Sequence, residues 1–177
     1  MKLIETSHLS SWAASKASES RFPHLVKDLI RATIDADKLR MPSGDAVWVP
    51  GFDGEISNSQ ENRFVPTGFS VWEIGTNSSP ASKAKEDYDK RTIDIAPSEE
   101  DKKTRKRKIP KRKIDRSALT FVFVTPRVWD NKEDWVYEKR TEGVWKDIQV
   151  IDGTDNWGPQ GQIEGIQSTG GSSTGWP

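Results

Sequence analysis

The sequence contains no cysteine and only two histidines, His8 and His24. The lack of cysteine excludes a disulfide scaffold, a thiolate zinc site and a cysteine nucleophile. Two histidines near one end of the chain argue against a histidine-based zinc site and against a Ser-His-Asp triad. Any chemistry must therefore come from carboxylates, lysine or arginine, hydroxyl groups, or a metal ion that prefers oxygen ligands.

Long apolar segments are also missing. No apolar run approaches the roughly 20 residues that span a bilayer. The N-terminus, MKLIETSHLSSW, lacks the apolar segment of roughly 7–15 residues found in signal peptides. We therefore expect a cytoplasmic protein with no membrane partner.

The chain has 177 residues, 27 Lys+Arg against 27 Asp+Glu, and 33% hydrophobic residues. This length suits one domain, which we place at residues 20–155, after an N-terminal arm at 1–19. Residues 156–177 are rich in Gly, Ser, Thr and Gln and are predicted to form a flexible tail. Residues 98–116 are predicted to form an exposed basic loop insertion, because nine of the twelve residues from 102 to 113 are basic.

Three segments have helical patterns. Residues 22–34 place apolar side chains on one stripe, with Ser20 as the expected N-cap and Pro23 in the first turn. Residues 80–91 form a polar pattern, and residues 131–140 are expected to end near a glycine. The side chains expected to pack inward from the last two helices are Ala81, Ala84, Tyr88, Trp135 and Val136.

Five shorter segments have extended patterns. They are residues 46–49, 52–56, 68–75, 119–124 and 145–151. The second and third are expected to pair in antiparallel fashion, and the nearly continuous apolar run at 119–124 predicts a central strand covered on both faces. The order of helices and strands predicts an α/β fold, a mixed sheet flanked by helices.

Two carboxylates fall within these strand patterns. Asp53 and Glu73 would lose hydration in a half-buried strand unless a cation or hydrogen bonds compensate. Two such carboxylates on neighbouring strands provide the oxygen ligands that Mg²⁺ or Mn²⁺ prefers, and a nearby lysine could stabilise a phosphoryl transition state. The alternative is that both acids are structural, one in an Asp-Gly turn and the other on a solvent face. Asp45 is a weaker third carboxylate and fits a turn-capping role better.

Five motifs in order resemble one bacterial family. They are PGFDG at 50–54, SVWEIGT at 70–76, KAKEDYDKRT at 83–92, TFVFVTPRVW at 120–129 and WKDIQVID at 145–152. Together they look like the PD-(D/E)XK, restriction-endonuclease-like domain found at the N-termini of anti-phage defence proteins, often fused to a P-loop NTPase module. The resemblance implies a sheet of about four to five strands and a Mg²⁺- or Mn²⁺-dependent endonuclease that cuts DNA. It also implies further domains in a longer parent chain and a homo-oligomer for double-strand cutting.

The resemblance assigns roles to particular residues. Asp53 matches the first metal carboxylate and Glu73 the acid of the second motif. The usual lysine two residues later is replaced by Gly75, and Lys83, in a Lys-Ala pair at the start of the next helix, takes its place. Gly75 leaves a volume beside Glu73 that a lysine from this helix could fill, with Lys85 as the substitute. The alternative is an ordinary surface salt bridge between residues 83 and 87.

Basic side chains around this region are candidates for contacts with DNA phosphates, which would weaken as salt concentration rises. They are Lys85, Lys90, Arg91, Lys106, Arg107, Lys111 and Arg112. A solvated insertion without a role explains the basic loop equally well. The lysine missing after the Glu also leaves open a catalytically inactive DNA-binding or protein-interaction module of the same fold. Zero net charge gives some weight to an interaction domain with no nucleic-acid partner.

Overall fold

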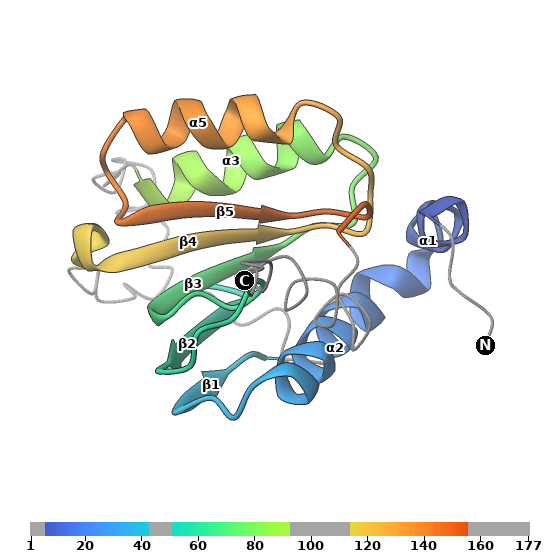
Figure 1. The fold of residues 1–177 in the computed structure, drawn as a ribbon. Helices are drawn as coiled ribbons and strands as arrows, with labels where there is room; N and C mark the ends of the chain where they lie inside the picture. Colours follow the sequence, from blue (N-terminus) through green and yellow to red (C-terminus); the bar gives the residue numbers. More distant parts are fainter. Residues whose placement is uncertain (1–5, 43–50, 93–113, 156–177) are drawn as a thin grey trace, which may run out of the picture.

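The computed structural model describes residues 6–42, 51–92 and 114–155, which form helices around one five-stranded sheet (Figure 1). The elements in chain order are α1 (Thr6–Ala13), α2 (Lys16–Thr33), β1 (Lys38–Arg40), β2 (Gly54–Asn58), β3 (Gly68–Ile74), α3 (Pro80–Thr92), a 3₁₀ helix (Arg116–Ala118), β4 (Leu119–Val124), α5 (Lys132–Thr141) and β5 (Asp147–Ile151).

The sheet is mixed, as predicted. Its strand order is β1-β2-β3-β4-β5. Strands β1, β2 and β3 pair in antiparallel fashion, whereas β3, β4 and β5 run parallel, with α3 and α5 in the two crossover connections. The chain therefore has an α/β architecture, and the predicted antiparallel pair before the first crossover is confirmed.

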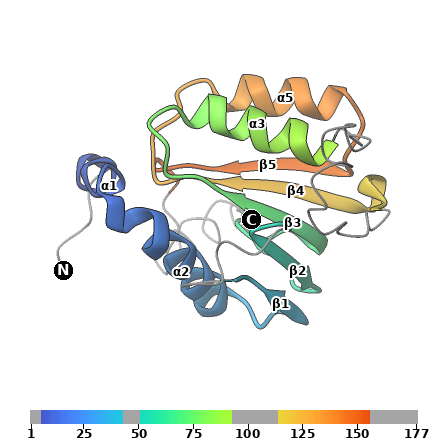
Figure 2. The same cartoon turned by 180° about the vertical axis from the view of Figure 1, so that it is seen from behind.

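Each face of the sheet packs against different helices. Helix α2 contributes Val26 and Ile30 to a core with Trp72 and Val122, while α3 and α5 close the opposite face (Figure 2). Strand β4 supplies both cores, because alternate side chains point to opposite faces of a strand. Its even-numbered valines belong to the α2 core and its two phenylalanines to the α3–α5 core. The prediction of a central strand covered on both faces is confirmed.

Helices α3 and α5 lie within one residue of their predicted bounds. Gly143, with a positive φ of 64°, follows α5 in the left-handed conformation that commonly ends helices. Ala84, Tyr88 and Val136 are buried as expected. Ala81 is exposed, so that part of the predicted packing is wrong: the buried stripe of α3 begins one turn later.

Helix α2 begins at Lys16, six residues earlier than predicted. Ser20 and Pro23 therefore lie inside the helix, and the N-cap position belongs to Ser15. Buried Ser18 donates its hydroxyl hydrogen bond to the carbonyls of Ala13 and Ser15, which ties α2 to the end of α1. The expected boundary between arm and domain at residue 20 falls within α2.

Some predicted elements are displaced and others lie outside the described residues. The expected strand at 52–56 is β2, two residues further along, and β1 was not predicted. The expected strand at 46–49, Asp45, residues 98–113 of the basic loop and the tail at 156–177 lie outside the described residues. None of the described helices is long and apolar enough to cross a membrane.

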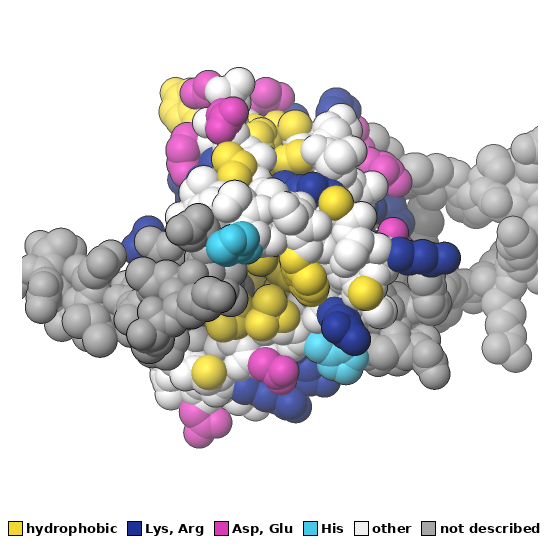
Figure 3. All heavy atoms as spheres, turned by 90° about the vertical axis from the view of Figure 1, so that its right-hand side faces the viewer, with side chains coloured by type: hydrophobic (Ala, Val, Ile, Leu, Met, Phe, Trp, Pro, Cys, Tyr) yellow, Lys and Arg dark blue, Asp and Glu magenta, His cyan; other side chains and the backbone are white. Residues whose placement is uncertain are grey.

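The side of the molecule beside α1 and α2 carries an apolar hollow (Figure 3). A cavity of about 250 Å³ is lined there by Leu9 of α1, by Phe22 and Leu25 of α2, and by Val124 and Ile151 at the ends of β4 and β5. This cavity lies on the α2 face, opposite the face that carries the two predicted carboxylates.

Candidate functional site

Asp53 and Glu73 come together at one end of the antiparallel pair. Asp53 directly precedes β2, whose pairing with β3 ends at Gly54 and Trp72. The Asp53 carboxylate accepts a hydrogen bond of 2.8 Å from the backbone N–H of Ile74, which fixes it at this end of β3. Asp53 and Glu73 are near enough to repel one another, which contributes to the raised pKa of Glu73. Their joint binding of a metal ion stays a prediction.

Glu73 is buried, with 2% of its surface exposed, and it pairs with Arg91. Arg91 comes from the last turn of α3 and donates from Nε to the Glu73 carboxylate. Its Nη2 donates to the carbonyl of Gly51, and its guanidinium lies 4.8 Å from the centre of the Phe52 ring. The structure thus directs Arg91 toward Glu73, whereas the sequence suggested a phosphate contact for this residue.

The electrostatics of Glu73 are unfavourable for its charged form. Burial raises the pKa of Glu73 to about 8, and repulsion from Asp53 and Asp87 adds to the effect, although the contacts with Arg91 lower it. Ionisation of a buried carboxyl group with a raised pKa costs free energy. An additional cation at this position would reduce that cost.

Gly75 and Lys83 pack against one another as the sequence suggested. A Cβ added at Gly75 would lie 2.8 Å from Cγ of Lys83 and 3.1 Å from Cζ of Phe123. Only a residue without a side chain allows the lysine to pass this closely over the end of β3. Lys83 therefore fills the volume beside Gly75, and its catalytic role stays a prediction.

The ammonium group of Lys83 is held by Asp87, one turn further along α3. The Nζ to Oδ1 distance is 2.7 Å, and only 1% of the Asp87 side chain is exposed. Burial raises the pKa of Asp87 despite this contact, and its second oxygen, Oδ2, has no hydrogen-bond partner among the described residues. Buried polar atoms usually have partners, so this exception marks Asp87 as part of the site.

We call Asp53, Glu73, Lys83, Asp87 and Arg91 the Glu73 cluster. The sequence suggested Asp87 only as a surface salt-bridge partner of Lys83, and it did not pair Arg91 with Glu73. A signal was present, because residues 83, 87 and 91 are spaced by four along α3 and therefore share one helix face. The sequence alone did not show that this face turns toward the sheet.

The remaining predicted basic residues lie outside this cluster. Lys85 is exposed and pairs with Asp89 at 2.5 Å, and Lys90 is also exposed. The four basic loop residues Lys106, Arg107, Lys111 and Arg112 lie outside the described residues. Among the predicted phosphate-binding residues that the structure describes, Lys85 and Lys90 are exposed on α3 and accessible to a phosphate.

The three carboxylates of the Glu73 cluster carry oxygen, the ligand type that Mg²⁺ and Mn²⁺ prefer, although Lys83 and Arg91 already pair with two of them. The unpartnered oxygen of Asp87 and the raised pKa of Glu73 both fit a cation at this position. Within residues 6–42, 51–92 and 114–155, however, no three His, Asp or Glu side chains form a group that could hold a metal ion. A metal site would therefore depend on Asp53 and Glu73 together with backbone oxygen or water.

Comparisons with protein-family models, with curated proteins and with solved structures find no match to this chain. Its resemblance to the PD-(D/E)XK family rests on the five motifs, and the family assignment remains a prediction.

Proposed function

We propose that this chain is a metal-dependent DNA endonuclease with a restriction-endonuclease-like fold, and that Asp53 and Glu73 hold Mg²⁺ or Mn²⁺. The observation that carries the proposal is the packing of Lys83 over Gly75. The stem of Lys83 passes over the glycine that stands where the resembling motif has a lysine, and its ammonium group pairs with Asp87 close to Asp53 and Glu73. The five-stranded mixed sheet supports the same reading.

The residues of the cluster have separable roles. The carboxylates of Asp53 and Glu73 would supply the metal ligands, and a bound divalent ion lowers the pKa of water and neutralises charge on a phosphodiester. Burial lowers the pKa of Lys83, but the hydrogen bond and charge of Asp87 raise it by more, so Lys83 stays protonated. A permanently charged lysine fits electrostatic stabilisation of the phosphate, not proton abstraction. Asp87 then acts as a positioning residue for Lys83.

In the proposed hydrolysis, the oxygen of a water molecule bonds to the phosphorus as the bond from phosphorus to the leaving sugar oxygen breaks. The attacking water releases a proton to solvent, and the leaving oxygen takes up a proton from solvent. One copy of this site would cut one strand. In keeping with the motif resemblance, the domain would act as the effector of a longer defence protein, with assembly of two copies needed to cut both strands.

A second candidate is a DNA-binding or protein-interaction module of the same fold without catalysis. The contact between Arg91 and Glu73 favours it, because this guanidinium already supplies a positive charge to the buried carboxylate. To bind a metal ion, the Glu73 carboxylate would have to release Arg91, or one of its oxygens would have to contact the metal while the other stays with Arg91. The two candidates therefore make opposite predictions for metal-dependent cleavage.

A plasmid-nicking assay with Mg²⁺ or Mn²⁺ separates the candidates. We expect Asp53→Asn and Glu73→Gln each to reduce nicking by about 100-fold or more, because they remove a charge while keeping the shape. Lys83→Met should also reduce nicking, with melting temperatures confirming that each variant is folded. The control is Glu133→Gln, an exposed acid in the first turn of α5, which should nick like the wild type.

Nicking that persists in both carboxylate variants would contradict the proposed site. DNA binding without nicking by the wild-type protein, in either metal, would support the inactive module instead.

A further inference from the structure

Three rows of side chains cross the antiparallel part of the sheet on the face of the Glu73 cluster. The first row is Glu73, with Asp53 close to it just before β2 begins. The second row is Arg40, Glu55 and Val71, and the third is Lys38, Ser57 and Phe69. Because side chains alternate along a strand, residues 69, 71 and 73 of β3 share this face, and the Cα atoms of the first and last are about 13 Å apart. The third row is thus continuous with the proposed active site.

A cavity of about 320 Å³ opens along the second and third rows. Phe52, Phe69, Val71, Ile114 and Leu119 supply apolar lining, and Lys38, Glu55, Ser57, Ser70 and Asp115 supply polar groups. This volume lies at the lower end of the range of about 300–1,000 Å³ for ligand pockets. Phe52 directly precedes Asp53, so the cavity begins one residue from a proposed metal ligand.

Phe69 distinguishes this cavity from ordinary core packing. This residue is 59% exposed, although the other aromatic residue in the lining, Phe52, is buried. An exposed aromatic ring within a row that also carries a lysine combines a stacking surface with a positive charge. Surfaces that bind single-stranded nucleic acid are built from these two features.

Resting on the proposed nuclease function, we infer that this cavity, the Phe69 cavity, receives an unpaired nucleobase of the DNA strand whose phosphate lies at the Glu73 cluster. The ring of Phe69 stacks on the base, Glu55 and Ser57 face its polar edge, and Lys38 lies beside the backbone of the same strand. A base inside a duplex must first be unpaired and unstacked, at a cost in free energy, before it can enter such a cavity. The preferred substrate is therefore single-stranded DNA, or DNA with unpaired nucleotides next to the cut, and intact duplex DNA binds less tightly.

Binding can be measured without cleavage by fluorescence anisotropy in EDTA. The probes are a short fluorescein-labelled oligothymidine, the same strand with abasic sites, and a duplex of equal length. We expect the wild type to bind the oligothymidine most tightly. Phe69→Ala should weaken that binding about 5- to 150-fold, and Phe69→Trp should retain it because the indole ring also stacks. Loss of the bases in the abasic strand should abolish the difference between wild type and Phe69→Ala.

Tyr137→Ala is the matched control, since Tyr137 is another exposed aromatic, 75% exposed on α5 and outside the cavity. Equal binding by wild type and Phe69→Ala, tighter binding of the duplex, an equal loss in Tyr137→Ala, or no binding of any probe would each overturn the inference. Failure of the proposed function has a different signature. Binding that depends on Phe69, without metal-dependent nicking, would contradict the nuclease function and support the base-binding cavity. Nicking that depends on Asp53 and Glu73, with DNA binding unaffected by Phe69→Ala, would support the nuclease function and contradict the base-binding cavity.

Discussion

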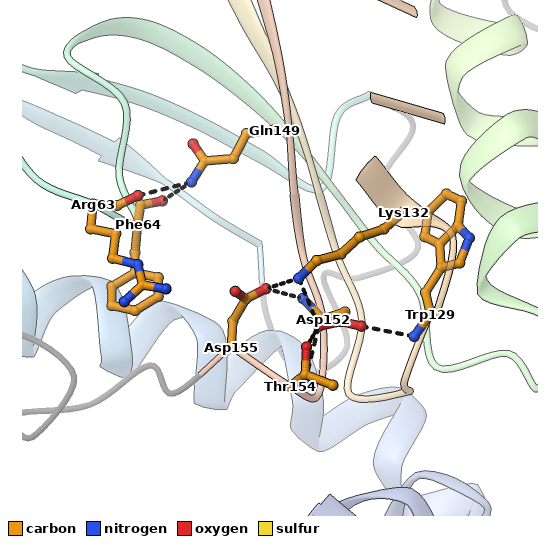
Figure 4. A network of polar contacts seen from close by, with 8 residues as sticks. All are labelled: Arg63, Phe64, Trp129, Lys132, Gln149, Asp152, Thr154 and Asp155. Atoms are coloured by element: carbon orange, nitrogen blue, oxygen red, sulfur yellow. Dashed lines mark hydrogen bonds and ion pairs between the residues drawn. The ribbon is translucent and has the colours of Figure 1, made fainter. Parts of the chain in front are cut away.

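The Glu73 cluster and the network around Asp152 are both buried and charged, but they differ in how well their carboxylates are compensated. Asp152, at the end of β5, accepts hydrogen bonds on both oxygens: from Lys132 at 2.9 Å and Thr154 on one, and from the backbone N–H of Trp129 at 2.8 Å on the other (Figure 4). Burial raises the pKa of Asp152, but the hydrogen bonds from Thr154, Lys132 and Trp129 outweigh it, so the pKa is lowered overall. In the Glu73 cluster the balance is opposite, and the pKa values of Glu73 and Asp87 are raised.

The difference separates structural charge from charge available for function. The Asp152 network joins the end of β5 to the start of α5, and the side chain of Lys132 reaches Asp155 as well as Asp152. Its charges stabilise the fold and are already neutralised. The Glu73 cluster keeps an unpartnered oxygen and a carboxyl group whose charged form is destabilised, which is typical of sites that bind a further group.

The largest expected effect is the loss of stability on breaking the Asp152 network. Asp152→Ala should lower the free energy of unfolding by about 3–5 kcal/mol, because it leaves Lys132 buried with one partner fewer and the N–H of Trp129 without its acceptor. Chemical denaturation measures the change. The control is Asp147→Ala, which removes an exposed pair with Arg140. A cost for Asp152→Ala no greater than for the control would show that the network is not structural.

The second effect is on the pH dependence of stability. The folded-state pKa of Glu73 is about 8, above its usual 4.5, so the folded state binds a proton that the unfolded state has released. The stabilisation is complete below pH 4.5 and is lost as pH rises toward 8, with a slope of at most about 1.4 kcal/mol per pH unit. Denaturation in EDTA at several pH values should therefore show that Glu73→Gln removes this decline.

Glu133→Gln, an exposed substitution of the same kind, should keep the wild-type pH dependence. Parallel profiles for wild type and Glu73→Gln would mean that the Glu73 carboxylate is fully compensated by Arg91, and that the two charged regions do not differ as described.

The smallest effect compares two lysines on α3 with the same spacing to an aspartate. Lys83→Met should cost about 1–3 kcal/mol, because it leaves buried Asp87 without its hydrogen bond. Lys85→Met should cost no more than about 0.5 kcal/mol, since its pair with Asp89 is exposed. Thermal and chemical unfolding of both variants measure the difference. Equal costs would show that burial does not distinguish the two pairs.

Much of the fold follows from local pattern. The apolar run at 119–124 predicted a strand whose two faces are both covered by helices. The alternation at 68–75 predicted which residues share a face of the sheet with Glu73. The length of helix α2 was underestimated because proline is common in the first turn of a helix, so Pro23 suggested that the helix begins there. Proline can also occur inside a helix, where it removes one backbone hydrogen bond, and Pro23 lies at such a position. The short strand β1 has no apolar alternation of its own and is specified by its pairing with β2.

The candidate site was predictable in part. Two acids on adjoining strands could be matched from their motifs, and the glycine beside Glu73 suggested a lysine from α3. The pair of Lys83 with Asp87 could be expected from its spacing, but the burial of Asp87 and the contact of Arg91 with Glu73 could not, because a helix as polar as α3 does not reveal which charged stripe faces the sheet. That orientation depends on the crossover from β3 to β4, a tertiary property.

The tight passage of Lys83 over Gly75 links these two positions. A side chain at position 75 would occupy the space that the stem of Lys83 now fills. A larger residue there therefore requires a smaller residue at position 83 or a different path for the lysine, whereas position 83 can change while the glycine is kept. The constraint between the two positions acts in one direction only.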